Sequence, residues 1–231
     1  MKTLKTLCLG MVAAAMLLTG CNSMTNTGKG ALIGGGSGAA VGAGLGALIG
    51  GGKGAGIGAA IGTAVGAGAG TLIGNRMDKQ KKELEKSLAN ADVETVQDQN
   101  GLAAIKVTFP GGILFPTNGT TLSASAQTEL AQFAASLKQN PETNVQIFGF
   151  TDNTGGMEVN TRIANGRALS VDRFLVDSGI APTRLSYQGI PMADYVASND
   201  TPAGRAQNRR VEIYITANQQ MIQQAEQGTL K

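Results

Sequence analysis

Apolar and polar positions alternate with two different periods over the C-terminal part of the chain, from about residue 92 to residue 217. Apolar residues at every second position indicate strands, and apolar residues three or four positions apart indicate helices. Asn100-Gly101 is typical of a hairpin turn, Ser123 of a helix cap and Gly179 of a helix end. The pattern predicts strands at 93–96, 102–109, 143–150, 184–190 and 211–217, and helices at 123–138 and 159–178.

These elements follow one another in the order β-β-α-β-α-β-loop-β. Helices with one apolar stripe, combined with strands, predict an α/β fold, here an α+β two-layer sandwich in which the helices cover one face of the sheet. The predicted module spans residues 92–217. The Gln-rich tail that follows it, residues 218–231, is expected to be flexible.

The first 21 residues have the layout of a secretory signal, because Lys2 and Lys5 precede an apolar run at 7–18 and small residues follow. Leu18-Thr19-Gly20-Cys21 resembles the lipobox of bacterial lipoproteins, which are cut before a cysteine that then carries acyl chains such as palmitate. We therefore expect a lipoprotein signal peptide at 1–20 and a lipidated N-terminus with a short linker at 21–29, with an ordinary signal peptide as the alternative. By resemblance to the Gram-negative sorting pattern, Asn22 favours the outer membrane.

Glycine recurs at every fourth position from Gly30 to Gly74. On a helix this spacing makes a groove that lets another backbone approach closely, as in paired membrane helices. Because glycine destabilises a helix in water, the ladder requires lipid or a packed partner, and the sequence favours neither. Lys53 divides it into two halves, each long enough to span a bilayer. We expect a helical hairpin at 30–74 that resembles the glycine-zipper segments of bacterial envelope lipoproteins, with a flexible spacer as the alternative.

Residues 75–91 are rich in charge and poor in apolar side chains. This composition predicts a solvated polar helix, a stalk that holds the folded module away from the membrane. A plain polar linker would serve the same purpose.

Composition excludes several classes of chemistry. The chain has no His, and its two cysteines, Cys8 and Cys21, both lie in the first 21 residues, so the folded module lacks Ser-His triads, thiol nucleophiles and His or Cys ligands for a metal. We expect no cofactor and no metal. Of the 19 basic residues Lys2 and Lys5 precede Cys21, which leaves 17 − 16 = +1 beyond it and gives no case for nucleic acid.

The densest polar cluster, residues 151–156, stands between a predicted strand and a predicted helix, where side chains and free N–H groups project into solvent. Arg167 lies on the apolar stripe of that helix and needs a partner, because an unpaired buried guanidinium is costly. Two readings are equally good. Asp152 and Arg167 form a structural ion pair, or they clamp a zwitterion whose ammonium meets Asp152 and whose carboxylate meets Arg167.

A resemblance decides between them. The module resembles the peptidoglycan-binding family typified by the C-terminal domain of OmpA, whose core order is β-α-β-α-β-β, over about residues 103–217. The resemblance implies that Asp152 and Arg167 hold the amino and carboxyl groups of meso-diaminopimelate in the peptidoglycan stem peptide, with Asn118, Asn160 and Arg209 around them. The matching motifs are Thr151-Asp152-Asn153-Thr154-Gly155, Asn160, Arg167-Ala168, Gly189, Asn199 and Gly204-Arg205-Ala206-Gln207-Asn208-Arg209-Arg210-Val211-Glu212-Ile213.

The sequence departs from the family pattern at three places. Phe150 stands where the family usually has His or Tyr, Ile163-Ala164 replaces a common Leu-Ser, and Pro116 replaces a frequent Asp. These changes remove polar groups near the site and leave the two clamp residues in place. Arg209 and Arg210 each have an alternative role as a structural brace.

The whole layout is similar to that of YiaD-type outer-membrane lipoproteins. We expect a non-enzymatic, lipid-anchored outer-membrane protein with its C-terminal domain in the periplasm, which binds peptidoglycan noncovalently and tethers the membrane to the cell wall. Its other partners would be the membrane itself and a second copy of the chain. The alternative is an assembly or pore-forming protein driven by the glycine zipper. A glycosidase using Asp152 and Glu158 is disfavoured, because the nearby Arg argues for binding.

Overall fold

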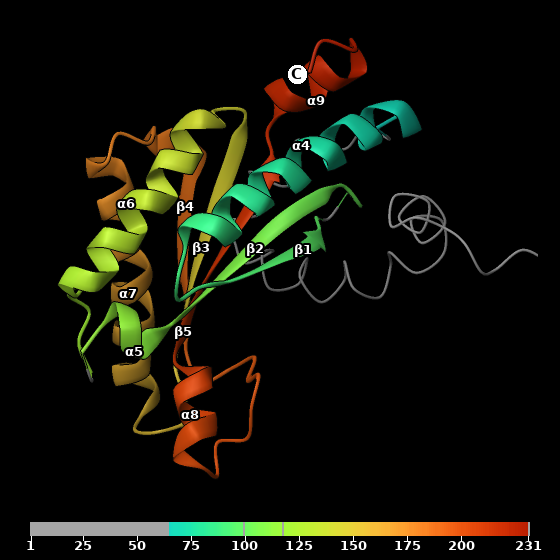
Figure 1. Cartoon of the computed structure of the whole chain (residues 1–231). Coiled ribbons are helices and arrows are strands. Elements are labelled where there is room, and N and C mark those ends of the chain that lie inside the picture. The colour runs from blue at the N-terminus through green and yellow to red at the C-terminus, as the bar shows by residue number, and fades with distance from the viewer. Residues whose placement is uncertain (1–64, 99, 117, 231) are drawn as a thin grey trace, which may run out of the picture. The chain divides into compact units, whose positions relative to one another are not determined.

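A computed structural model of the 231-residue chain describes residues 65–98, 100–116 and 118–230. Within them the backbone forms one five-stranded sheet with the strand order β1-β2-β5-β3-β4 (Figure 1). β3 and β4 are parallel, and the other neighbouring pairs are antiparallel. The strands are β1 (Asp92–Gln97), β2 (Ala103–Pro110), β3 (Thr143–Phe150), β4 (Leu185–Ile190) and β5 (Arg210–Ala217).

Three long helices pack on the sheet: α4 (Ala67–Ser87), α6 (Ala124–Gln139) and α7 (Met157–Asp177). α4 contacts β1 and β2, α7 contacts β3 and β4, and α6 lies between the two helices (Figure 1). Their apolar faces and the inward residues of the strands form one core, which includes Ile105, Phe133, Ile147 and Ile213. The expected two-layer sandwich is confirmed.

Four short elements complete the described part: α5 (Gly111–Leu114), the 3₁₀ turn η1 (Pro182–Arg184), α8 (Pro202–Asn208) and α9 (Gln219–Glu226). α8 falls within the stretch expected to be a loop before the last strand. Thr201 caps α8, because its side chain accepts a hydrogen bond from the Gly204 N–H.

Local signals in the sequence define one end of each of the two predicted helices. The Ser123 side chain caps α6 by accepting a hydrogen bond from the Ala126 N–H (3.1 Å), as expected. Gly179 follows α7 with φ +90°, and the next N–H, that of Ile180, donates to the Leu175 carbonyl. This is the Schellman arrangement, which a residue without a side chain adopts readily, and it confirms the predicted helix end.

α7 lies unusually close to the sheet. Gly149 on β3 and Gly189 on β4 face each other across the parallel pair, and a methyl group on either would overlap the backbone of α7 at Ala164 or Asn165. The side chain of Asn165 also accepts a hydrogen bond from the Gly189 N–H (2.9 Å). These contacts fix the helix that carries Arg167 relative to the strand that leads to Asp152.

The expectation of a solvated stalk at 75–91 is wrong. α4 begins at Ala67 and runs through the expected boundary between residues 74 and 75 without interruption. Its charged residues lie on one side, while the other side is buried in the core through Ile73, Met77, Leu84 and Leu88. Although residues 75–91 are rich in charge, their few apolar side chains recur with helical spacing and form a buried stripe.

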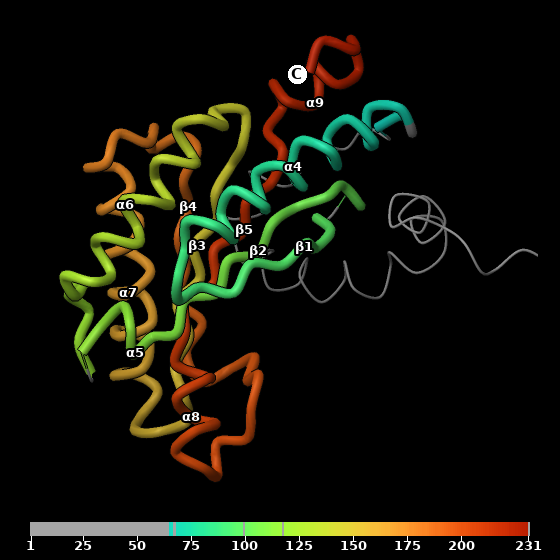
Figure 2. The backbone as a smooth tube through the Cα atoms, viewed as in Figure 1, coloured from blue at the N-terminus to red at the C-terminus, as the bar shows by residue number. Residues whose placement is uncertain are grey.

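The expectation of a flexible tail at 218–231 is also wrong over most of its length. Asn218 caps α9 by accepting a hydrogen bond from the Met221 N–H (3.0 Å), and Met221, Ile222 and Ala225 are buried. α9 packs against α4, so the two ends of the described chain lie side by side (Figure 2).

Three expectations fall outside the described residues: the signal peptide, the lipidated Cys21 and the glycine ladder up to residue 64. Within 65–98, 100–116 and 118–230, no helix combines the length and apolar character that a membrane span needs.

Candidate functional site

Asp152 stands two residues beyond the end of β3, in the turn that leads into α7. Its residue exposure is only 5%, and its two carboxylate oxygens have separate partners. Oδ1 accepts a hydrogen bond from the Thr154 N–H (2.8 Å), and Oδ2 forms an ion pair with Arg209 Nη1 (2.5 Å). The turn and the end of α8 together position this carboxylate.

Arg167 projects from the third turn of α7 and is 3% exposed. Its Nε donates a hydrogen bond to the Gly119 carbonyl (3.1 Å), and its guanidinium lies over the ring of Phe115 at 5.4 Å from the centroid. No carboxylate of the described residues lies within 4.0 Å of it, which is ion-pair distance. The guanidinium is thus held by the Gly119 carbonyl at Nε and by the Phe115 ring at one face, and no carboxylate of the described residues contacts it.

The structural ion pair between Asp152 and Arg167, one of the two readings of the sequence, is therefore not formed. Asp152 pairs with Arg209 instead, and this residue comes from the C-cap of α8. The Arg209 side chain is 39% exposed and that of Asp152 is 7% exposed, so the pair opens to solvent on the arginine side.

The charges of this cluster act on one another. Burial would raise the pKa of Asp152, but the hydrogen bonds from Thr154 and the contact with Arg209 outweigh it and hold the pKa below its ordinary value. Burial lowers the pKa of Arg167, the positive charge of Arg209 lowers it further, and Asp152 opposes both effects. The guanidinium groups of Arg167 and Arg209 thus both interact electrostatically with the carboxylate of Asp152.

The other predicted site residues stand around this cluster. Asn160 is buried and its Nδ2 donates to the Thr154 and Gly156 carbonyls, so it shapes the turn that carries Asp152. Thr151 is buried and its hydroxyl accepts a hydrogen bond from the Met192 N–H (3.0 Å). Thr154 is exposed, and Asn118 is exposed in the left-handed region with φ 56°. Asn160 thus stabilises the turn that carries Asp152, and Thr151 connects this turn to the loop after β4.

A fully buried amide organises the loop on the far side of the site. Asn208 Oδ1 accepts hydrogen bonds from the Val196 and Ala197 N–H groups, and its Nδ2 donates to the Ala197 carbonyl and to Asn199 Oδ1. Asn199 Oδ1 also accepts a long hydrogen bond from the Asn153 N–H (3.4 Å). These contacts connect the loop before α8 to the turn that contains Asp152.

Arg210 is the structural brace that the sequence left as an alternative for either arginine. It is buried on the sheet, forms an ion pair with Glu212 (2.6 Å) and lies 3.8 Å from the centre of the Phe150 ring. The Tyr214 hydroxyl donates to the second oxygen of Glu212, and burial together with that carboxylate raises the pKa of Tyr214. Arg210 is therefore buried beside Glu212 on the sheet, whereas the neighbouring Arg209 is partly exposed beside Asp152.

Sequence reasoning missed two residues that hold Arg167. Phe115 supplies the ring under the guanidinium, and Gly119 supplies the carbonyl that accepts from Nε. Phe115 was noticeable in the sequence as an aromatic residue at the end of an apolar run. The carbonyl left no signal, because every residue has one.

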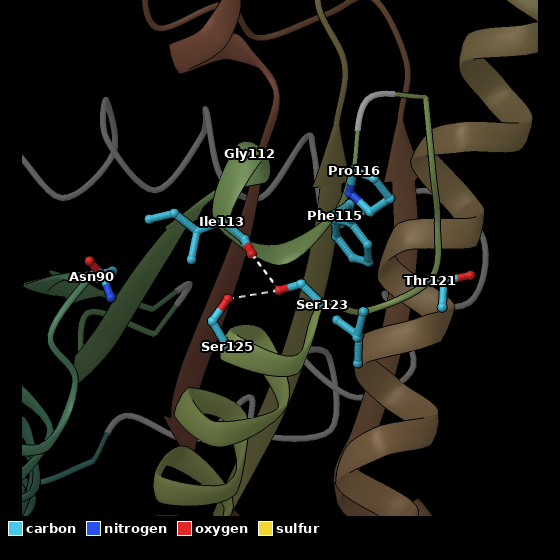
Figure 3. A pocket seen from close by; sticks show the side chains of 9 residues that line it. Asn90, Gly112, Ile113, Phe115, Pro116, Thr121, Ser123 and Ser125 are labelled. Carbon is cyan, nitrogen blue, oxygen red and sulfur yellow. Dashed lines mark hydrogen bonds between the residues drawn. The ribbon is translucent and has the colours of Figure 1, made fainter.

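A hollow of about 590 Å³ lies on the other side of the loop that contains Phe115 (Figure 3). It runs between α5, the start of α6 and this loop. Its lining residues are Asn90, Gly112, Ile113, Phe115, Pro116, Thr121, Leu122, Ser123 and Ser125.

The described residues contain no group of three or more Asp, Glu, His or Cys side chains placed to hold a metal ion. Glu158, the second carboxylate of the disfavoured glycosidase reading, is exposed on the first turn of α7. What the cluster can do chemically is bind a ligand that carries both charges.

Residues 114–209 match the model of the OmpA family. This segment contains Phe115, the turn with Asp152, α7 with Arg167, and Arg209. The chain is therefore similar to this family over residues 114–209. The N-terminal residues 1–78 match a second model, the YMGG-like Gly-zipper. The resemblance found in the sequence is thereby confirmed.

Known proteins with similar sequences include a probable lipoprotein and a peptidoglycan-binding protein. The chain is 36% identical over 143 residues to the probable lipoprotein YiaD of Escherichia coli, covering 62% of this chain and 64% of YiaD. It is 38% identical over 113 residues to the peptidoglycan-binding protein ArfA of Mycobacterium tuberculosis, covering 49% of this chain and 35% of ArfA. The chain thus spans just under two thirds of the first relative and about a third of the second.

Two solved structures share the fold of the α/β module. A putative MotB-like protein from Desulfovibrio vulgaris superposes with a TM-score of 0.54 at 24% identity, over 65% of this chain and 96% of that one. The cell wall anchor of the type VI secretion system from Pseudomonas aeruginosa gives a TM-score of 0.52 at 25% identity, over 62% and 98%.

Proposed function

We propose that this chain is a non-enzymatic outer-membrane lipoprotein that binds peptidoglycan noncovalently and tethers the outer membrane to the cell wall. Support comes from the similarity to the OmpA family and from relatives described as a probable lipoprotein and as a peptidoglycan-binding protein. The proposed ligand is the diaminopimelate of the stem peptide, whose free end carries an ammonium and a carboxylate on one carbon atom.

One observation carries this proposal: a buried carboxylate and a buried guanidinium lie in one cluster, and the guanidinium has no carboxylate in contact among the described residues. Asp152 receives the ligand's ammonium, and Arg167 binds the ligand's carboxylate through two parallel hydrogen bonds. Phe115 and the Gly119 carbonyl hold the guanidinium in place before the ligand arrives. Asn118, Asn160, Thr151 and Thr154 maintain or border the turns around them.

Arg209 takes part as the group that the ligand replaces. In the free domain it supplies the positive charge at Asp152 Oδ2, which is where the ligand's ammonium binds. Because its side chain is more than one third exposed, it can turn away without leaving a buried charge behind. Once released, it adds a second guanidinium for the ligand's carboxylate.

The N-terminal region supplies the anchor in this proposal. A signal peptide at 1–20 is removed, Cys21 carries acyl chains that hold the protein in the outer membrane, and the glycine ladder follows the linker at 21–29. Many copies in one membrane face one continuous wall, so avidity turns a weak single site into a firm attachment.

Sedimentation of the full chain with insoluble peptidoglycan tests the proposal. The chain should pellet with diaminopimelate-type peptidoglycan, and much less with lysine-type peptidoglycan, which lacks the carboxylate that Arg167 binds. Asp152→Ala and Arg167→Ala should stay in solution, whereas Arg162→Ala, an exposed position on the same helix, should pellet like wild type. Equal pelleting of wild type and both site variants would overturn the proposal.

A second function is assembly through the glycine zipper, and the match of residues 1–78 to the Gly-zipper model favours it. The structure changes the design of its test, because α4 begins at Ala67 and is part of the folded domain. Deletion of 30–64 leaves α4 intact. A tether should keep its binding to peptidoglycan after this deletion, whereas an assembly protein should lose its oligomers and its activity.

A further inference from the structure

The hollow beside the site has the lining of a binding pocket for a neutral ligand. Its volume, about 590 Å³, falls in the range of small-molecule sites. It opens to solvent, since Gly112, Pro116, Thr121 and Ser125 on its border are exposed. None of its nine lining residues carries a charge.

Apolar and hydroxyl-bearing side chains share the lining. Ile113 and Leu122 offer apolar surface, while Thr121 and Ser125 carry hydroxyl groups (Figure 3). The Thr121 hydroxyl has no hydrogen-bond partner within the described part of the chain, and that of Ser125 contacts only Ser123 Oγ (3.0 Å). A sugar ring presents apolar C–H faces and an edge of hydroxyl and acetamido groups, so it matches both kinds of surface.

One loop separates this hollow from the charged cluster. Phe115 lines the hollow and also lies under the Arg167 guanidinium. Further along the loop, the Gly119 carbonyl accepts from Arg167 and the Thr120 carbonyl accepts from the Ser170 hydroxyl (2.6 Å). A ligand with a zwitterionic end and a neutral end can therefore contact both sides of the same loop.

We propose that the hollow binds the neutral N-acetylated sugars of the glycan strand from which the stem peptide branches. This inference rests on the proposed function, because the peptide end of the ligand is the part that Asp152 and Arg167 hold. The domain then recognises both components of the cell wall: the peptide by charge and the sugar by shape and hydroxyl contacts.

Binding of soluble fragments to the full chain tests the proposal by calorimetry. Three probes are compared: the stem tripeptide ending in diaminopimelate, the same peptide attached to its disaccharide, and an uncharged oligomer of N-acetylglucosamine. In wild type the disaccharide should tighten binding of the peptide by about tenfold. Gly112→Leu and Ser125→Leu fill the hollow and should remove that gain while leaving the affinity for the bare peptide unchanged.

Gln132→Leu is the matched control, because it adds the same side chain at an exposed position of α6 away from the hollow. A disaccharide that adds nothing in wild type, or a gain that survives both filling substitutions, overturns the inference while leaving the proposed function standing. If no peptide binds and the sugar oligomer still binds in a way that Ser125→Leu abolishes, the assignment of diaminopimelate to Asp152 and Arg167 fails and the sugar site stands. If neither probe binds, both fail.

Discussion

Replacing Arg167 by Lys separates the charge of this residue from its shape. Lysine keeps the positive charge, but it lacks the planar fork that donates two parallel hydrogen bonds to a carboxylate. It also lacks Nε, which in wild type donates to the Gly119 carbonyl at 3.1 Å, and the flat group that lies over Phe115.

The contacts allow the size of both effects to be worked out. Loss of one of two charge-assisted bonds to the ligand costs about 1.5–3 kcal/mol. That corresponds to binding weaker by about 10- to 150-fold. In the free protein, loss of the Nε bond and of the contact with the ring should lower the free energy of unfolding by about 2–3 kcal/mol.

Calorimetric titration with the diaminopimelate tripeptide measures the first effect, and chemical denaturation measures the second. Arg162→Lys, an exposed position on the same helix, should leave both quantities unchanged. If Arg167→Lys is folded and binds the peptide within about threefold of wild type, then only the charge matters and the assignment of a two-bond contact is refuted.

Three further predictions concern the frame of the site. Gly189→Ala should destabilise the domain by about 1–3 kcal/mol in denaturant unfolding, because its methyl group meets the backbone of α7, whereas Gly112→Ala, which meets nothing within 4 Å, should have almost no effect. The pKa of Asp152 is lower in the folded state, so its contribution to stability is present above the ordinary value of 3.8 and is lost as the pH falls through the folded pKa. Peptide binding, measured across pH, should accordingly be constant from about pH 5 to pH 8 and decline only in stronger acid, and a decline near neutrality would contradict this role. Removal of residues 219–231 should lower the unfolding free energy by about 3 kcal/mol or more, because Met221 and Ile222 lose their burial, and a denaturation midpoint equal to that of wild type would show that α9 contributes nothing.

The elements of the sandwich could be predicted because their signals are local. The strands, the cap at Ser123 and the glycine after α7 each depend on a few neighbouring residues, and all of them are confirmed. α4 was misjudged because its composition is dominated by charge. The positions that bury it, at 73, 77, 84 and 88, nevertheless have helical spacing and could have been noticed.

The sequence predicted which residues belong to the candidate site better than it predicted which of them contact one another. Asp152 and Arg209 are 57 positions apart, and no spacing rule links them, because their contact depends on how α8 packs beside the turn after β3. The family resemblance placed Arg209 at the site, but the residues alone left either of the two adjacent arginines as the brace. The sheet decides this, since Arg210 is the first residue of β5 and lies beside Glu212 and Phe150.

Because α4 packs on the sheet as a helix, its residues span a much shorter distance than they would as an extended chain. A pull on the chain ahead of Ala67 acts on the first turn of this helix before it acts on the sheet, because α4 precedes β1 in the chain. Its 21 residues rise about 1.5 Å each as a helix and about 3.4 Å each when extended, which releases roughly 40 Å. α9, packed against α4, resists the start of this process. In the proposed tether, a sudden separation of the membrane from the cell wall would therefore extend this segment before the force reaches the site at Asp152 and Arg167.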